Sequence, residues 1–148
     1  MVYDLKMSMF GPLPIRVILG ISFFLHGLPK LMNPERTQGF LSNIGMPIEL
    51  SIAIILLEVI GGIAILIGLA TRIIALLFSI FMISIILVVK LPDGFIGGYE
   101  LELLLAAMSV SLVLTGPGIL SIEWNILKRE AIPKGLEIDN SAKIKNKR

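Results

Sequence analysis

The residues best placed to do chemistry are ionisable side chains that lie inside, or at the ends of, long apolar stretches. If those stretches cross a membrane, a charge at the bilayer centre costs about 2.5–3.5 kcal/mol, so it faces other helices or water and finds a partner. Glu58 lies near the middle of the apolar stretch 48–69. An acid there either holds protons or forms a structural ion pair with a cation on the first helix. The full set is Arg16, His26, Lys30, Glu58, Arg72, Lys90, Glu100 and Glu102.

One face of the first apolar stretch carries polar groups at both ends and glycines between them. The residues of this face follow one another at intervals of 4, 3, 4 and 3 positions, from Arg16 to Lys30, so they lie on one stripe of a helix. His26 comes one turn before Lys30, so an imidazole and an ammonium share the outer end. A lone histidine of this kind either makes a hydrogen bond between helices or binds a ligand. The stripe consists of Arg16, Gly20, Phe23, Gly27 and Lys30.

Other glycines and basic residues of the apolar stretches are expected to pack helices together or to fix their orientation in the membrane. Gly61 and Gly62 follow Glu58 by one turn, and small residues there let another helix approach closely, as at Gly20 and Gly27. Arg72 is expected to anchor the topology, and Arg16 either does the same or forms a structural ion pair. Residues 97–100 begin the last apolar helix with Tyr99 and Glu100, where the helix dipole favours an acid.

Four apolar stretches can position these groups. A bilayer core of about 30 Å needs roughly 20 helical residues. Residues 70–72 are the entire connection between the second and third stretches, which predicts antiparallel neighbouring helices. Residues 33–45 are mixed, and Phe40, Leu41 and Ile44 share one helical face, which indicates a short helix in the membrane interface. The four stretches are 13–29, 48–69, 73–89 and 99–115.

Composition supports an all-α integral membrane four-helix bundle and limits its chemistry. Hydrophobic residues make up 55% and charged residues 16% of the chain, against about 25% charged in ordinary soluble domains. With no cysteine and one histidine, the chain supplies no thiolate ligands, no bis-histidine haem site and no three-histidine zinc site. We therefore expect no metal or haem. Basic residues are not interleaved with aromatic ones, so nucleic acid is not an expected partner.

The distribution of basic residues predicts that both termini are cytoplasmic. With that orientation, 10 Lys and Arg residues lie inside and 3 lie outside, as the positive-inside rule requires. Residues 1–122 then form the transmembrane domain. Residues 123–148 form a basic cytoplasmic tail with 7 Lys or Arg and 4 Asp or Glu. This tail is either solvated or adheres to anionic membrane lipids.

The same residues, in the same order, form a pattern that resembles the DoxX family of small membrane proteins, from about Arg16 to Ser121. The resemblance implies a four-helix bundle in a prokaryotic plasma membrane and a link to quinone-dependent redox chemistry, because the family is similar to the membrane subunit of thiosulfate:quinone oxidoreductase. Many relatives have a second histidine where this chain has Lys90, so a mechanism with two imidazoles is not expected. The matching positions are Arg16, Leu19, Gly20, Phe23, His26, Gly27, Lys30, Phe40, Gly45, Pro47, Glu58, Gly61, Gly62, Gly68, Leu69, Thr71, Arg72 and Gly97 to Glu100.

Two functions follow as hypotheses. In the first, the chain is a quinone-binding subunit of an oxidoreductase complex and other membrane subunits supply the electrons, since the chain has neither metal ligands nor a dinucleotide-binding glycine loop. Its expected binding cluster is His26, Lys30, Glu58, Tyr99 and Glu100. In the second, the chain is a non-catalytic structural subunit whose charges are internal ion pairs. Transport of a small solute is weaker, because no stretch is broken at its centre by Gly or Pro.

Overall fold

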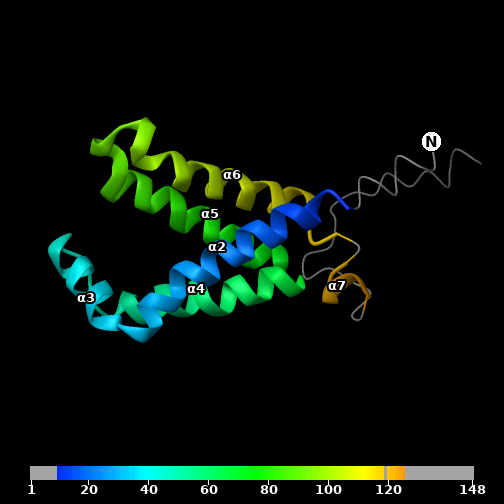
Figure 1. Cartoon of the computed structure of the whole chain (residues 1–148), viewed down its shortest axis with the longest axis horizontal. Coiled ribbons are helices and arrows are strands. Elements are labelled where there is room, and N and C mark those ends of the chain that lie inside the picture. The colour runs from blue at the N-terminus through cyan, green and yellow to red at the C-terminus, as the bar shows by residue number, and fades with distance from the viewer. Residues whose placement is uncertain (1–9, 119, 126–148) are drawn as a thin grey trace, which may run out of the picture.

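The computed structural model describes residues 10–118 and 120–125, and every regular element in those residues is helical (Figure 1). The four long apolar helices that can span a membrane are Pro12–Met32, Leu50–Ile67, Thr71–Asp93 and Phe95–Thr115. The predicted all-α class and the four spans are confirmed. In chain order the helices are α2 (Pro12–Met32), α3 (Pro34–Asn43), α4 (Leu50–Ile67), α5 (Thr71–Ile85), α6 (Glu100–Thr115) and α7 (Ile122–Asn125).

Local sequence explains where these helices begin and end. α2 begins at a proline, which fits the first helical turn because that turn needs no amide donor. A glycine directly follows α4 and another follows α6: Gly68 has a φ of 70° and Gly116 a φ of 78°. Glycine adopts positive φ angles at low cost. Beyond α5 the third span continues through a π-helical turn, Ile86–Lys90, and a 3-10 turn, Leu91–Asp93.

The four spans are arranged as two packed pairs. α2 lies along α4, and α5 lies along α6. The short connection makes α4 and α5 meet, as predicted, although it consists of residues 68–70 and not 70–72. Each of these two helices packs mainly on another helix. The two pairs converge at the end where α7 lies and diverge toward the end where α3 lies (Figure 1).

Glycines determine how closely α2 approaches α4. A Cβ added at Gly62 would lie 2.7 Å from the backbone nitrogen of Phe24, and one at Gly20 would lie 2.8 Å from the carbonyl oxygen of Gly62. Gly61 instead faces α5, where an added Cβ would lie 3.0 Å from the ring of Phe78. That ring stacks on Phe23 of α2, with centroids 3.5 Å apart, and so links the two pairs.

Arg16 closes the end at which the pairs converge. Its side chain is 2% exposed, and Nη2 donates hydrogen bonds to the carbonyl oxygens of Leu66 at 3.1 Å and Leu120 at 2.6 Å. Nη1 donates to the carbonyl oxygen of Pro117. These carbonyls lie at or beyond the C-terminal ends of α4 and α6, where helices leave acceptors unpaired and favour a cation. One guanidinium therefore ties both pairs together.

Glu123 completes this end. Its carboxylate accepts a hydrogen bond from the backbone N–H of Thr71 at 2.7 Å, at the start of α5, and its own N–H donates to the carbonyl oxygen of Gly68 at 3.2 Å. Its negative charge also acts on Arg16. The expected tail 123–148 thus begins with a residue buried in the bundle, and residues 126–148 lie outside the described part. Arg72 is half-buried in the first turn of α5.

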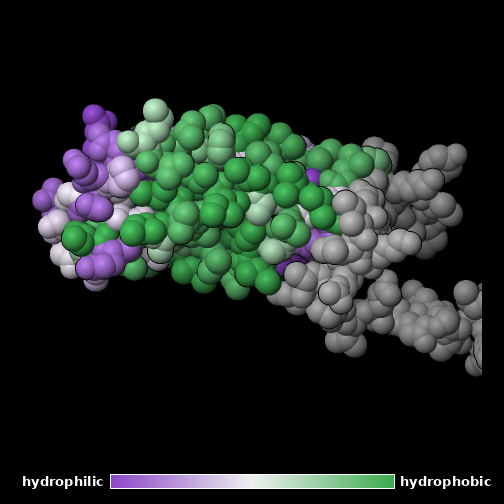
Figure 2. Space-filling model, turned by 90° about the horizontal axis from the view of Figure 1, so that it is seen from below, coloured by the Kyte–Doolittle hydropathy of each residue, from purple (hydrophilic) through white to green (hydrophobic). Residues whose placement is uncertain are grey.

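The outer surface is that of a membrane protein. Most of the side chains that the long helices expose are large and apolar. They form a continuous apolar band, and polar residues gather at the end of the described structure where α3 and the turn 91–93 lie (Figure 2). The described chain begins and ends at the opposite end (Figure 1).

We predict that Gly62→Ala lowers the free energy of unfolding by about 1–3 kcal/mol, as overpacking does, because the new methyl group meets the backbone of α2. Unfolding with SDS in detergent micelles would measure the change. Gly39→Ala is the matched control, since an added Cβ there meets nothing within 4 Å. Equal stability of the two variants would contradict the close contact of α2 with α4.

Candidate functional site

An ion pair between α2 and α4 lies at the end where the helix pairs diverge. Lys30 Nζ lies 2.6 Å from Glu58 Oε1, and the two side chains are 34% and 3% exposed. Gly27 makes room for this pair, because a Cβ there would lie 2.8 Å from Cβ of Glu58. A glycine one turn before the lysine thus allows the acid of α4 to lie against α2 and reach the ammonium.

The pair leaves hydrogen-bonding capacity unused. Glu58 Oε2 is buried and has no hydrogen-bond partner among residues 10–118 and 120–125. An ammonium has three N–H donors. In the described structure the Lys30 ammonium donates one hydrogen bond, to Glu58 Oε1. Lys30 can therefore donate further hydrogen bonds, and Glu58 can still accept a hydrogen bond or a proton at Oε2.

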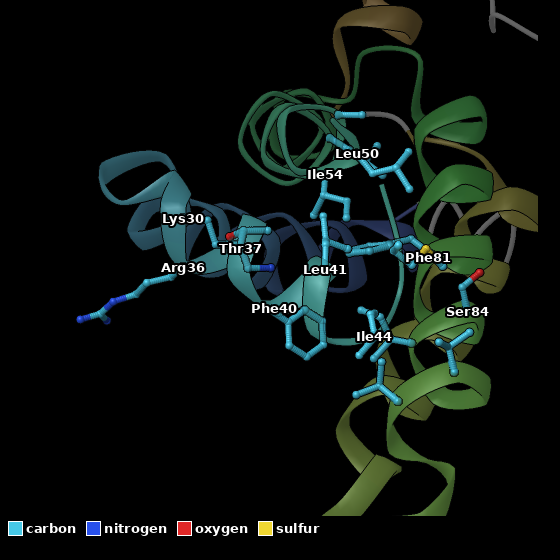
Figure 3. A pocket seen from close by; sticks show the side chains of 16 residues that line it. Lys30, Arg36, Thr37, Phe40, Leu41, Ile44, Leu50, Ile54, Phe81 and Ser84 are labelled. Carbon is cyan, nitrogen blue, oxygen red and sulfur yellow. The ribbon is translucent and has the colours of Figure 1, made fainter. Parts of the chain in front are cut away.

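Lys30 also lines a cleft of about 530 Å³ between α3, α4 and α5. This volume falls within the usual range for sites that bind small molecules, about 300–1,000 Å³. Leu41 of α3 and Ile54 of α4 lie between Lys30 on one side and Phe81 on the other, and the side chain of Arg36 extends away (Figure 3). The lining residues are Lys30, Arg36, Thr37, Phe40, Leu41, Ile44, Met46, Leu50, Ala53, Ile54, Leu57, Phe81, Ser84, Ile85, Val88 and Val89.

The other expected site residues lie in different places. His26 is exposed on α2 and lies within electrostatic range of Glu58. Tyr99 packs edge-on against Phe95, with ring centroids 5.6 Å apart, and Glu100 is exposed. In the described structure neither of these two makes a hydrogen bond or ion pair with Lys30 or Glu58. The structure thus joins two members of the expected cluster, Lys30 and Glu58.

Most of the cleft is not evident from the sequence. Phe40, Leu41 and Ile44 are expected on one face of a short helix, and all three line the cleft. The apolar residues of α5, such as Phe81, resemble ordinary membrane-facing side chains in the sequence. No specific partner is expected for Lys90 or Glu102, yet they form a second ion pair, 4.0 Å long, on the other helix pair.

A family model named DoxX matches residues 11–91, a segment that contains α2, α3, α4, α5 and the pair Lys30–Glu58. The chain belongs to the DoxX family. It is 42% identical over 118 residues, 80% of this chain and 88% of the relative, to the protein named "Putative oxidoreductase CatD" from Bacillus subtilis (strain 168).

Two further relatives are membrane proteins by name. This DoxX-family chain is 31% identical to uncharacterized membrane protein Rv3486 from Mycobacterium tuberculosis (strain ATCC 25618 / H37Rv), over 78% of the chain and 80% of the relative. It is 30% identical to inner membrane protein YqjF from Escherichia coli (strain K12), over 84% of the chain and 98% of the relative. No solved structure matches the chain significantly.

We predict that Lys30→Met destabilises the bundle because it leaves the charge of Glu58 buried without its ammonium. The loss should be smaller than the roughly 3–5 kcal/mol found for fully buried pairs, since a third of the Lys30 side chain is exposed. The double variant Lys30→Met/Glu58→Leu should recover much of the stability in SDS unfolding. Additive losses in the double variant would mean that the two side chains do not interact.

Proposed function

We propose that this DoxX-family protein is the membrane subunit of a quinone-linked oxidoreductase complex, with the quinone head group bound in the cleft beside Lys30. The observation that carries the proposal is that one side chain, Lys30, both lines the apolar cleft and pairs with a deeply buried acid. The name of the Bacillus subtilis relative supports an oxidoreductase, and the apolar band supports a site reached from the membrane.

The residues of the cleft fit a quinone. Its walls are almost entirely apolar, which suits a flat hydrophobic ring, and the Lys30 ammonium is a charged donor for a carbonyl oxygen. When bound, a quinone supplies two-electron, two-proton redox chemistry. Lys30 would orient the ring, Glu58 would hold a proton at Oε2, and the walls formed by α3 and α4 would exclude water.

The electrons must come from another subunit. The chain has no cysteine and a single histidine, so its own side chains cannot ligate an iron–sulfur cluster or a bis-histidine haem. Partner membrane subunits and surrounding lipids are therefore part of the proposal. The proposal also places the protein in the plasma membrane of a prokaryote, which agrees with its bacterial relatives. It places both termini in the cytoplasm, which agrees with the described chain beginning and ending at the same end of the bundle.

A structural subunit is the second candidate function, and the geometry of Lys30–Glu58 favours it directly. The pair joins α2 to α4, and glycine contacts join the same two helices. In this alternative Glu58 stabilises the bundle, and the protein packs against a larger membrane complex without binding a quinone.

We predict that Glu58→Gln leaves assembly intact and lowers quinone turnover by about 10²–10⁴-fold, the usual contribution of a positioned acid–base group. The assay would use the complex purified from native membranes in mild detergent, with partner subunits and bound quinone quantified by mass spectrometry. Glu102→Gln is the matched control, because Glu102 pairs with Lys90 on the other helix pair.

The outcomes separate the two candidate functions. An assembled Glu58→Gln complex with full turnover would contradict the proton-holding role. A complex that contains the wild-type chain but no quinone, and that loses subunits in the Glu58→Gln variant, would establish the structural subunit instead.

A further inference from the structure

We infer that the cleft binds the tail of its quinone as well as the head group, and that the tail lies along α5 and leaves between α3 and α5. This inference rests on the proposed function and adds a specificity determinant to it. It assigns the apolar wall formed by Phe81, Ile85 and Val88 to a long hydrocarbon chain, so the preferred ligand is a quinone with an isoprenoid tail.

The charged groups of the cleft lie on the side away from α5. Lys30 of α2 and Thr37 of α3 are on the side away from α5, and Phe81 and Ser84 are on the α5 side (Figure 3). Ser84 does not offer its hydroxyl hydrogen to a ligand in this structure, because Oγ donates it to the carbonyl oxygen of Ile80 at 2.8 Å. A head group that needs hydrogen-bond donors therefore binds on the Lys30 side, and whatever extends from it meets apolar side chains.

The cleft also has an exit on the side where the tail is expected. Phe40 of α3 and Val88, which follows α5, both line the cleft, yet they are 46% and 51% exposed. They therefore lie at its mouth. Val88 belongs to the third membrane-spanning stretch, Thr71–Asp93, so this mouth opens toward the lipid. A chain that leaves between these two residues passes into the bilayer without exposing apolar surface to water, which the hydrophobic effect favours.

The experiment compares ubiquinone-2, which has a two-isoprene tail, with tailless ubiquinone-0, in nanodiscs of one zwitterionic lipid that contain the full chain with its co-purified subunits. Equilibrium binding is measured for the wild type, Lys30→Met, Val88→Trp and Leu87→Trp. Leu87 precedes Val88, is 63% exposed and does not line the cleft, so its variant is the matched control. Partition of the probe into lipid is the same for all four proteins and cancels in their ratios.

We expect Val88→Trp to weaken binding of ubiquinone-2 by about tenfold or more, because the indole fills the exit and displaces several buried methylene groups. Binding of ubiquinone-0 should stay within twofold, roughly the scatter expected for a group that does not contact it. Leu87→Trp should change neither. Ile44→Trp, on the α3 side of the cleft, gives a second obstruction with the same expected result if Val88→Trp fails to fold.

The remaining outcomes distinguish the two proposals. If Lys30→Met weakens both quinones but the tail adds no affinity and Val88→Trp has no effect, the tail site is wrong and the head-group site stands. If farnesol, a ringless isoprenoid, binds with the same Val88 dependence while ubiquinone-0 does not bind, the tail site stands and the quinone function is wrong. Absence of binding by all three probes overturns both.

Discussion

One buried guanidinium determines the shape of this bundle. Arg16 donates hydrogen bonds to carbonyl oxygens at the end of α4 and beyond the end of α6, so it joins the two helix pairs where their C-terminal acceptors would otherwise be unpaired. Its desolvation is costly, and each of these charge-assisted bonds offsets part of that cost. With the pairs joined at this end, they separate toward the other end, and the cleft lies there.

The ion pair at the open end depends on the same geometry. The glycine contacts at Gly20 and Gly62 bring α2 and α4 together, and Gly27 extends this approach to the level of Glu58. An unpaired carboxylate in the middle of an apolar helix would destabilise the folded protein. Lys30, at 2.6 Å, offsets part of this cost. The same contact holds the ammonium at the wall of the cleft.

The sequence predicted the membrane spans because their length and apolar composition are direct consequences of bilayer thickness. It also predicted α3, whose three apolar residues share one face. An ion pair between Glu58 and a cation of the first helix was among the expected alternatives, and Lys30 on α2 forms it. The packing of α5 on α6 was not predicted, because every span is apolar on several sides and hydropathy does not specify which helix packs against which. For that reason Tyr99 and Glu100 were grouped with Lys30, although α6 packs mainly on α5. The burial of Glu123 was also missed, because its neighbours in sequence form a basic segment typical of a solvated tail.

The ion pair with Lys30 accounts for Glu58 Oε1 and leaves Oε2 without a partner among the described residues. Ser51 and Glu58 are seven residues apart, on one face of α4, and Ser51 Oγ and Glu58 Oε2 are both buried without a hydrogen-bond partner among the described residues. Buried polar atoms are nearly always paired, and each exception requires a reason such as a catalytic role. A residue that served only to hold α2 against α4 would be more stabilising with its second oxygen satisfied, or as an apolar side chain of the same size. Under the proposed function, Glu58 Oε2 would be the atom that accepts and releases protons, because it lies beside an ammonium that lines the cleft. Glu102 Oε2 is also buried without a partner among the described residues, but neither Glu102 nor Lys90 lines the cleft.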